Sequence, residues 1–315
     1  MSEPAGSPAA PGEALRDAGL PAVHLAANSA SMSGQKEYLR WTRARLSFVI
    51  VAAAAGAWAA AAGKPAGWHK ALAAIAVASF FIAFAAEILL LTRRPEELWY
   101  HGRAVAESSK TLAWRYAMRA DPFAAAETDA EADARITERL RDLLAKSPIA
   151  SRLPPVAGAD ITEPMCALRG ATLDERKQAY ITSRVSDQWT WYASKAKYNS
   201  KRAKIWRTLL IVFELGGAVW AILILAGVTA VVLDGVLAAM VAGAGAWLGV
   251  KQFENLAEAY NLTATELGFV RSEAHSVTGE AGWSTYVNSA EQAISREHTM
   301  WLARRVKLNP QAGPG

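Results

Sequence analysis

The sequence predicts an all-α integral membrane protein with two transmembrane helical hairpins, four spans in total, and long cytoplasmic helices. Hydrophobic residues make up 52% of the 315 residues and charged residues 20%. The chain is therefore more apolar and less charged than an average soluble domain. The apolar residues are concentrated in a few blocks, and no segment of useful length alternates as a half-buried strand does. This pattern excludes a disordered or fibrous protein and argues against an ordinary soluble enzyme.

The first predicted hairpin consists of two apolar blocks. Residues 46–63 contain no charged residue, and residues 71–91 contain one, Glu87. Each block is close to the roughly 20 residues that cross a hydrocarbon core. The connection between them holds Pro65, glycines and Trp68, as a turn at a membrane interface does. The alternative, buried helices of a soluble bundle, is disfavoured because these blocks offer no polar face.

The second predicted hairpin lies between Arg207 and Lys251, where the chain has no basic residue. This stretch is long enough for spans at about 208–226 and 228–250, joined by a tight turn near Gly227. The same argument against a soluble bundle applies to it, since neither block has a polar face.

The remaining sequence divides the chain into units. Small residues and prolines predict a disordered tail at the N-terminus, and four prolines predict one linker. The predicted segments are a tail at 1–34, a first unit at 35–148, a linker at 149–170, a second unit at 171–306 and a tail at 307–315.

Helical spacing predicts polar helices around both hairpins. A helix starts at Pro95, where Glu96 and Glu97 favour the first turn, and another covers about 127–146. The second unit begins with one long helix that runs into its first span, and a further helix leaves its second span. A last helix follows the turn at Gly279–Gly282.

Lysine and arginine near the span ends predict the orientation. Arginines flank the outer ends of the first hairpin, a dense basic run precedes the second, and the hairpin turns carry only Lys64 and Lys70. Basic residues stay on the cytoplasmic side. We therefore expect a multi-pass protein of the inner (cytoplasmic) membrane with both termini in the cytoplasm.

The basic and aromatic run at 189–207 has two interpretations. Interleaved rings and cations are typical of single-stranded nucleic-acid binding. Here the cations spread around the helix, directly before a span, so a collar for the anionic headgroups of the lipid bilayer is favoured. Direct nucleic-acid binding is not expected.

Residues for catalysis or cofactor binding are not evident. Cys166 is the single cysteine and five histidines are scattered, so we expect no metal site, no cofactor and no enzyme activity. No phosphate-binding or nucleophile motif occurs. Glu297 and His298 are adjacent on a helix, where neighbours point about 100° apart, so an ordinary solvated surface is favoured over an acid–base pair.

Three acids lie within the predicted spans, and such residues are candidates for function. Glu87 and Glu214 lie roughly 6 and 9 Å from the cytoplasmic ends of their spans, and Asp234 lies roughly 9 Å from the opposite end. In an oligomer, Glu87 and Glu214 can form a ring of carboxylates that lines a cation pathway. The alternative is that Glu87 reaches Arg93 or Arg94, and that Glu214 and Asp234 bond neighbouring helices.

The polar helices resemble a known family. The segment LTRRPEELWYHGRAVAESSKTLAWRYAMRADPF after the first hairpin and the helices around the second hairpin resemble two SLATT domains, the two-transmembrane effector domains associated with SMODS nucleotidyltransferases and SLOG sensors. The matching motif residues are Trp99, Tyr100, Arg103, Glu107, Lys110, Trp114 and Arg115 in the first unit, and Arg184, Trp191, Tyr192, Glu291, Glu297, His298 and Trp301 in the second.

This resemblance implies a bacterial membrane effector that forms pores in nucleotide-linked antiviral defence ending in cell suicide. We recognise no fused nucleotide-sensing domain, so a separate cytoplasmic signalling protein is the expected source of the signal. The first hypothesis is a homo-oligomeric pore or channel, with Arg103, Glu107, Lys110 and Arg115 as buried ion-pairing positions of a gating bundle. The alternative is a non-conducting membrane-anchored scaffold that docks a cytoplasmic partner. A secondary transporter is disfavoured because no span is broken by proline.

Overall fold

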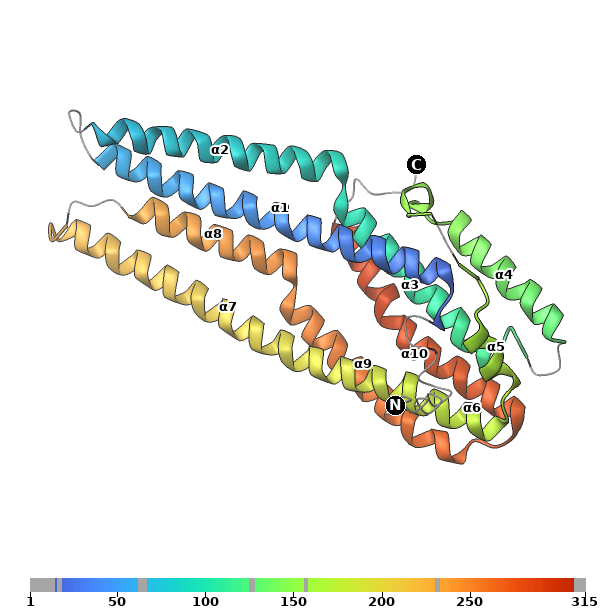
Figure 1. Ribbon diagram of the computed structural model, residues 1–315. Helices are drawn as coiled ribbons and strands as arrows, with labels where there is room; N and C mark the ends of the chain where they lie inside the picture. Colours follow the sequence, from blue (N-terminus) through green and yellow to red (C-terminus); the bar gives the residue numbers. More distant parts are fainter. Residues whose placement is uncertain are drawn as a thin grey trace, which may run out of the picture. The chain divides into compact units, whose positions relative to one another are not determined.

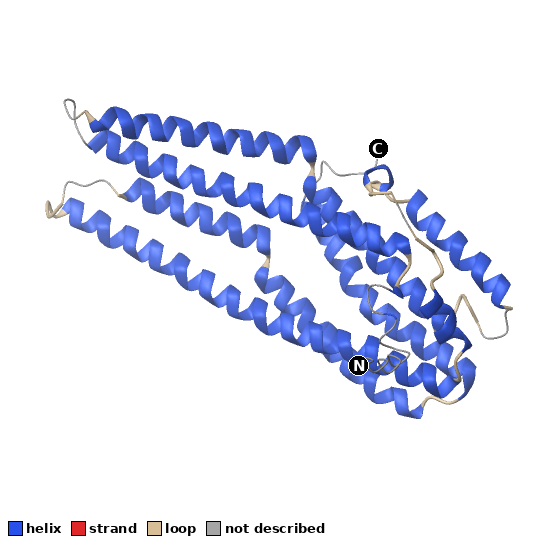
Figure 2. Cartoon of the chain, in the orientation of Figure 1, coloured by secondary structure: helices blue, strands red, loops and turns tan. Residues whose placement is uncertain are grey.

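The computed structural model confirms the all-α fold (Figures 1 and 2). It describes residues 15, 19–61, 67–124, 128–155, 158–229 and 233–308, with side chains except at 61, 234 and 296–308, and no strand occurs in these ranges. The helices are α1 (Ala22–Ala61), α2 (Trp68–Arg93), α3 (Pro95–Ala117), α4 (Asp129–Ala145), α5 (Glu163–Gly170), α6 (Leu173–Tyr180), α7 (Asp187–Leu225), α8 (Asp234–Lys251), α9 (Phe253–Glu273) and α10 (Gly279–Leu308). Shorter helical pieces are η3 (Ala150–Arg152), the π-helical η4 (Ile181–Ser186) and η5 (Ala274–Ser276).

The described helices form two compact units, each built from segments far apart in the sequence. The hairpin unit takes Gln35–Glu96 and Lys197–Ala257, and therefore holds the span parts of α1, α2, α7 and α8. The bundle takes the chain before residue 35, Glu97–Ala196, and the chain from Glu258 onward.

Four helices are long and apolar enough to cross a membrane, which confirms the predicted number of spans. Their large apolar side chains are not buried within the chain: Phe81 on α2 is 67% exposed and Ile222 on α7 is 63% exposed. A soluble protein does not expose such continuous apolar faces, so these helices need lipid or other helices around them. The chain is a multi-pass membrane protein.

The second hairpin differs from its predicted bounds. The third span ends at Leu225, and Gly227 takes a left-handed φ of 70°, as expected for a turn glycine. The fourth span begins at Asp234, several residues later than the predicted 228. Residues 228 and 229 belong to the turn that follows Gly227, so the fourth span is shorter than predicted.

Both hairpins end in the same backbone break. Arg94 after α2 and Gln252 after α8 are left-handed, with φ of 43° and 48°, and the N–H of each donates to a carbonyl one turn earlier. Pro95 then begins α3, as predicted, and Phe253 begins α9. The helix that was expected to continue out of the fourth span is therefore interrupted at Gln252.

The bundle has one main apolar core with an aromatic centre. Tyr180 on α6 is fully buried and meets the rings of Trp114 and Trp283 edge-on, each with ring centroids 5.6 Å apart. Ile136 and Leu140 of α4 belong to the same core. They lie on the buried side of the helix that was predicted at 127–146. The edge-on packing of the aromatic rings stabilises the core beyond what the burial of their surface area contributes.

The predicted tail at 1–34 is wrong in its last part, because residues 22–34 are helical and packed in the bundle. Ser31 Oγ donates to the Trp99 carbonyl at 2.9 Å, and His24 Nδ1 lies 2.8 Å from the Ala106 carbonyl. A Cβ at Gly102 would lie 3.0 Å from the Ala27 carbonyl oxygen, so α1 and α3 cross at close range. Small residues make this crossing possible, yet the same composition is typical of disorder. Most of residues 1–18 lie outside the described part of the chain.

The predicted linker at 149–170 holds more structure than expected. It contains η3 and α5, and Met165 and Leu168 of α5 are buried in the main core. Pro164 lies in the first turn of α5, where a missing N–H costs nothing, so the prolines do not prevent a helix here.

A long helix does run from Leu173 into the third span, as predicted, and it contains the π-helical turn η4. Thr172 caps its start: its hydroxyl accepts from the Glu175 N–H while Glu175 reaches back to the Thr172 N–H. A π-helical turn inserts an extra residue and shifts the side chains that follow around the helix axis. Arg184, one of the motif residues, lies in η4 and is buried.

Candidate functional site

The first intramembrane acid, Glu87 of α2, has a partner inside the hairpin unit. It forms an ion pair with Arg45 of α1, both side chains being about one-third exposed. This partner was not the expected one: Arg93 pairs with Glu37, at 3.0 Å. The carboxylate of Glu87 therefore holds α1 and α2 together near one end of their spans.

The second intramembrane acid, Glu214 of α7, has no such partner. Its side chain is exposed, and within the described residues it makes no hydrogen bond or ion pair. Its neighbours Val212 and Leu215 are 55% and 62% exposed, and no residue in the most apolar window of this helix is buried. An isolated carboxylate thus lies on an apolar helix surface that the chain itself leaves uncovered.

The third acid, Asp234, is the first residue of α8 and lies beside the hairpin turn. Its expected depth within the span was wrong because the span starts at Asp234 itself. Its side chain lies outside the described part of the structure, so the structure does not bring the three acids together in one site.

The most enclosed charged group of the bundle is Glu291 on α10, with 0% exposure. It accepts four hydrogen bonds from three side chains of other elements. Arg184 gives two of them, from Nε at 2.9 Å and Nη2 at 2.7 Å; Tyr180 gives one at 3.0 Å; Thr111 of α3 gives one at 2.8 Å. A buried carboxylate with all these donors has its hydrogen-bonding capacity satisfied. Through it, α10 is joined to α3, α6 and η4 at one point.

The electrostatics of this cluster keep the ion pair charged. Burial alone would lower the pKa of the Arg184 guanidinium, but the charge of Glu291 and its hydrogen bonds raise that pKa above its ordinary value. Burial, and then the Glu291 charge, raise the pKa of Tyr180, so its hydroxyl stays a donor. The cluster is therefore a structural junction in which Arg184 stays charged and Tyr180 stays protonated near neutral pH.

Other motif residues from the first and second predicted sequence units (35–148 and 171–306) also meet within the bundle. The rings of Trp191 and Tyr192 lie 5.0 Å apart, and the guanidinium of Arg103 on α3 lies 6.0 Å from the Trp191 ring. Arg103 also pairs with Glu107 at 3.6 Å. Trp99, Trp114 and Tyr192 are buried, and Tyr100 is half-buried. Burial was expected for Arg103, Glu107, Lys110 and Arg115, but these four are only half-buried. The side chains of Glu297, His298 and Trp301 lie outside the described residues.

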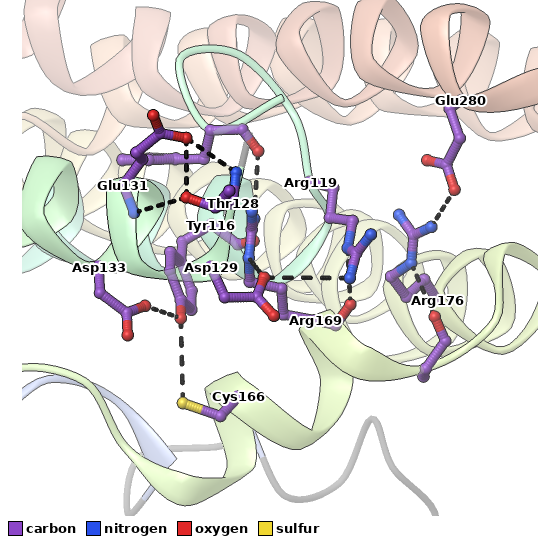
Figure 3. A network of polar contacts seen from close by, with 12 residues as sticks. Tyr116, Arg119, Thr128, Asp129, Glu131, Asp133, Cys166, Arg169, Arg176 and Glu280 are labelled. Atoms are coloured by element: carbon purple, nitrogen blue, oxygen red, sulfur yellow. Dashed lines mark hydrogen bonds and ion pairs between the residues drawn. The ribbon is translucent and has the colours of Figure 1, made fainter. Parts of the chain in front are cut away.

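A second polar network, around α5, was missed by reasoning from the sequence (Figure 3). Arg169 is 2% exposed and donates to the carbonyls of Tyr116 and Phe123 and to Asp129. Arg176, also 2% exposed, donates to the Met118 carbonyl and pairs with Glu280. The available signal was their position beside the apolar residues of short helices, but an arginine in such a place is usually on the surface.

Two further groups belong to this network. Burial, and then a hydrogen bond to Asp133, raise the pKa of the Tyr116 phenol. Cys166 of α5 is exposed and its Sγ lies 3.9 Å from the Tyr116 hydroxyl (Figure 3). Among the described residues no group of three or more His, Cys, Asp or Glu is placed to hold a metal ion.

These features define a class: an all-helical multi-pass membrane protein with two hairpins and one shared polar bundle. Residues 21–177 match the family model described as SMODS and SLOG-associating 2TM effector domain 3, and residues 180–301 match the model described as SMODS and SLOG-associating 2TM effector domain 1. The chain belongs to the SLATT family and carries two SLATT domains in tandem. Comparison with curated proteins and with solved structures found no match.

The two SLATT domains are not the two compact units. Each domain gives one hairpin to the hairpin unit and several helices to the bundle. Thr111 belongs to the first domain, whereas Tyr180, Arg184 and Glu291 belong to the second. The Glu291 junction thus ties the two domains together inside one bundle.

Proposed function

We propose that this protein is a bacterial membrane effector that assembles into an oligomeric pore or channel. The observation that carries the proposal is Glu214, a carboxylate without a partner among the described residues, on a span with no buried residue in its most apolar window. Placing an acid alone in the hydrocarbon core costs about 2.5 kcal/mol or more when the residue lies at mid-membrane. Copies of α7 gathered around water would remove that cost, because each carboxylate would then be hydrated.

The geometry gives Glu214 a role distinct from that of Glu87. Glu87 is neutralised by Arg45 within the chain, so it contributes little field to a pore. A ring of Glu214 carboxylates would attract cations and repel anions, as charged rings do in cation channels. Glu214 is therefore the lining residue of the proposed pore, and Glu87 serves mainly to hold the first hairpin together.

The family assignment supports the biological setting. Both matched descriptions name effector domains that associate with SMODS and SLOG proteins. We place the protein in the inner membrane with both termini and the bundle in the cytoplasm, where a separate signalling protein linked to a nucleotide signal would trigger it during antiviral defence. No residue is assigned a catalytic or cofactor-binding role.

Reconstitution into liposomes tests the pore. Purified full-length protein should release an entrapped cation, and Glu214→Ala should lower the cation-to-anion preference by about tenfold, which corresponds to about 1.4 kcal/mol. Glu138→Ala removes an exposed acid from α4 and is the matched control, expected to leave release unchanged. Release unaffected by Glu214→Ala would discard the lining residue, and no release in any oligomeric state would favour the non-conducting scaffold.

Cysteine labelling in intact cells tests the orientation. Cys166 is exposed, so it is first replaced by serine to remove background. A new cysteine at Gly67, which lies at the start of α2, should react with a membrane-impermeant maleimide, and one at Ala171 should react only after lysis. The reverse pattern would invert the proposed topology and place the bundle outside the cytoplasm.

A further inference from the structure

A cleft of about 510 Å³ lies inside the hairpin unit, between α1, α7 and α8. Figure 1 shows the span parts of these three helices running alongside one another. The volume is in the range that holds a ligand of moderate size. The cleft is lined by Arg43, Leu46, Ser47 and Ile50 of α1, Tyr198, Arg202, Trp206 and Phe213 of α7, Met240, Gly243, Ala244, Trp247 and Lys251 of α8, and Phe253.

The lining is cationic at one end. Each helix contributes one base at the polar end of its span: Arg43, Arg202 and Lys251. The ring of Trp247 brings two of them together, with the Arg43 guanidinium 5.2 Å and the Lys251 ammonium 5.8 Å from its centroid. The lining residues include three basic side chains and no carboxylate, so the wall of the cleft itself is cationic.

Three other arginines near the span ends are neutralised by acids, unlike two arginines of the cleft. Arg45, Arg93 and Arg207 pair with Glu87, Glu37 and Glu254, respectively. Arg43 and Arg202, in contrast, form no ion pair within the residues that the structure describes; their guanidinium groups lie over the rings of Trp247 and Tyr198, respectively. Converging cations repel one another, and an anion placed among them would convert repulsion into attraction.

The lining is apolar at the other end. Along α1 it passes from Arg43 to Ile50, about 10 Å deeper, and along α8 it passes from Lys251 to Met240, about 16 Å deeper. A Cβ at Gly243 would lie 3.0 Å from Ile50 Cδ1, so α1 and α8 meet closely at this depth. The cleft therefore changes from cationic to hydrocarbon-like in the direction of the bilayer core.

We propose that this cleft is a binding site for one anionic phospholipid per chain. The phosphate would lie among Arg43, Arg202 and Lys251, and an acyl chain would follow Leu46, Ile50 and Met240. A small soluble phosphate compound matches only the first half of this lining and would leave the apolar half wet. The site is thus specific in a way that a general collar of basic residues is not, because it needs three particular bases and a neighbouring apolar wall.

Native mass spectrometry of the full-length protein in a mild detergent tests the site. The protein is titrated with phosphatidylglycerol and with phosphatidylcholine of identical acyl chains. The first phosphatidylglycerol should bind about tenfold more tightly than phosphatidylcholine, because phosphatidylglycerol is a net anion whereas the choline cation of phosphatidylcholine offsets the charge of its phosphate. Arg202→Gln or Arg43→Gln should remove that preference, since each variant takes away a positive charge that attracts the net anion. The matched controls Lys201→Gln and Arg40→Gln remove the same charge from neighbouring positions that do not line the cleft, and should keep the preference.

Three outcomes would overturn the proposal. Equal losses in the variants and their controls would indicate a general basic collar, and equal affinity for the two lipids would show that the net negative charge of the lipid is not recognised. Glycerol phosphate that competes as well as the lipid would indicate a soluble anion as the ligand. If Arg202→Gln does not fold, Arg202→Lys keeps the charge and should retain most of the preference. Lipid binding is independent of leakage from liposomes, so the two proposals fail separately.

Discussion

In the bundle, the carboxylate of Glu291 is fully enclosed and receives hydrogen bonds from Thr111, Tyr180 and Arg184. In the hairpin unit, the carboxylate of Glu214 has no partner among the described residues and lies beside exposed apolar side chains. At these two positions the bundle pairs a buried carboxylate inside one chain, whereas the hairpin unit leaves a carboxylate without a partner among the described residues. This difference separates a region that holds the fold together from one that acts on its surroundings.

The contrast also exists inside the hairpin unit. Glu87 pairs with Arg45, while Glu214, in the other hairpin, forms no pair with any residue that the structure describes. In the most apolar 18 residues of each helix, 28% of the residues are buried in α2 and none is buried in the helix that contains α7. The first hairpin is therefore the better packed of the two within the chain, and the second is the one that we expect to contact neighbouring subunits or water.

The largest expected effect is on the buried junction of the bundle. Glu291→Ala leaves Arg184 buried without a counter-charge and should destabilise the bundle by about 3–5 kcal/mol. Replacing both residues by apolar ones of similar size, Arg184→Met with Glu291→Leu, should restore much of the loss. Thermal unfolding followed by near-ultraviolet circular dichroism measures both. A single variant that unfolds at the wild-type temperature would show that the junction does not hold the two SLATT domains together.

The next effect concerns the docking of the first turns of α1 on α3. Gly102→Val places a side chain against the backbone of Ala27 and Ser31, where a Cβ would already lie at 3.0 Å, and should cost about 1–3 kcal/mol. Gly170→Val is the control, because a Cβ there has open space. Limited proteolysis near residue 22 should accelerate in the first variant alone. Equal behaviour of both variants would argue that residues 22–34 are not held by this crossing.

A smaller effect distinguishes the two carboxylates of the hairpin unit. A double-mutant cycle on Arg45→Gln and Glu87→Gln should give a coupling energy of about 0.5–1 kcal/mol, as for other polar pairs between membrane helices. Glu214→Gln should not lower the thermal stability of the subunit, since no bond is lost. A drop in subunit stability with Glu214→Gln, measured in detergent at low protein concentration, would contradict the view that this group has no partner within the chain.

The smallest effect is a dependence of helix stability on pH. Hydrogen bonds from Thr128 lower the pKa of Glu131, and those from Thr172 lower the pKa of Glu175. A carboxylate with a lowered folded-state pKa stabilises the fold above its unfolded pKa, and this stabilisation is lost as pH falls through the folded value. Unfolding temperatures measured from neutral to acidic pH should therefore fall less steeply for Thr128→Val than for the wild type. Parallel pH curves would show that the capping box has no such role.

Much of the fold was predictable because it depends on local composition. All four spans, the start of α3 at Pro95, the helix near 127–146 and the long helix into the third span follow from apolar blocks, capping residues and helical spacing. The segments that were predicted wrongly have a composition that is compatible both with disorder and with a packed helix. Residues 22–34 and α5 are rich in small residues or proline, and only their contacts with α3 and the main core select the helix.

The candidate site was less predictable, because a residue type does not reveal its partner. Arg184 and Glu291 were recognised as motif positions, but nothing near either one indicated that they bond each other. Arg169 and Arg176 were missed because an arginine is normally exposed. Likewise, the bases around the spans look alike in sequence, and only the structure separates Arg45, which is paired, from Arg43, which lines the cleft.

The sequence by itself determined where the chain can cross a membrane and that the rest is helical, because hydropathy and helical periodicity are sums over neighbouring residues. Tertiary structure alone decided which charges are satisfied. Arg184 and Glu291 are 107 residues apart, and Thr111 and Glu291 are 180 apart. Interactions across such separations depend on how helices pack, and that packing also leaves Glu214, Arg43 and Arg202 without a counter-charge among the described residues.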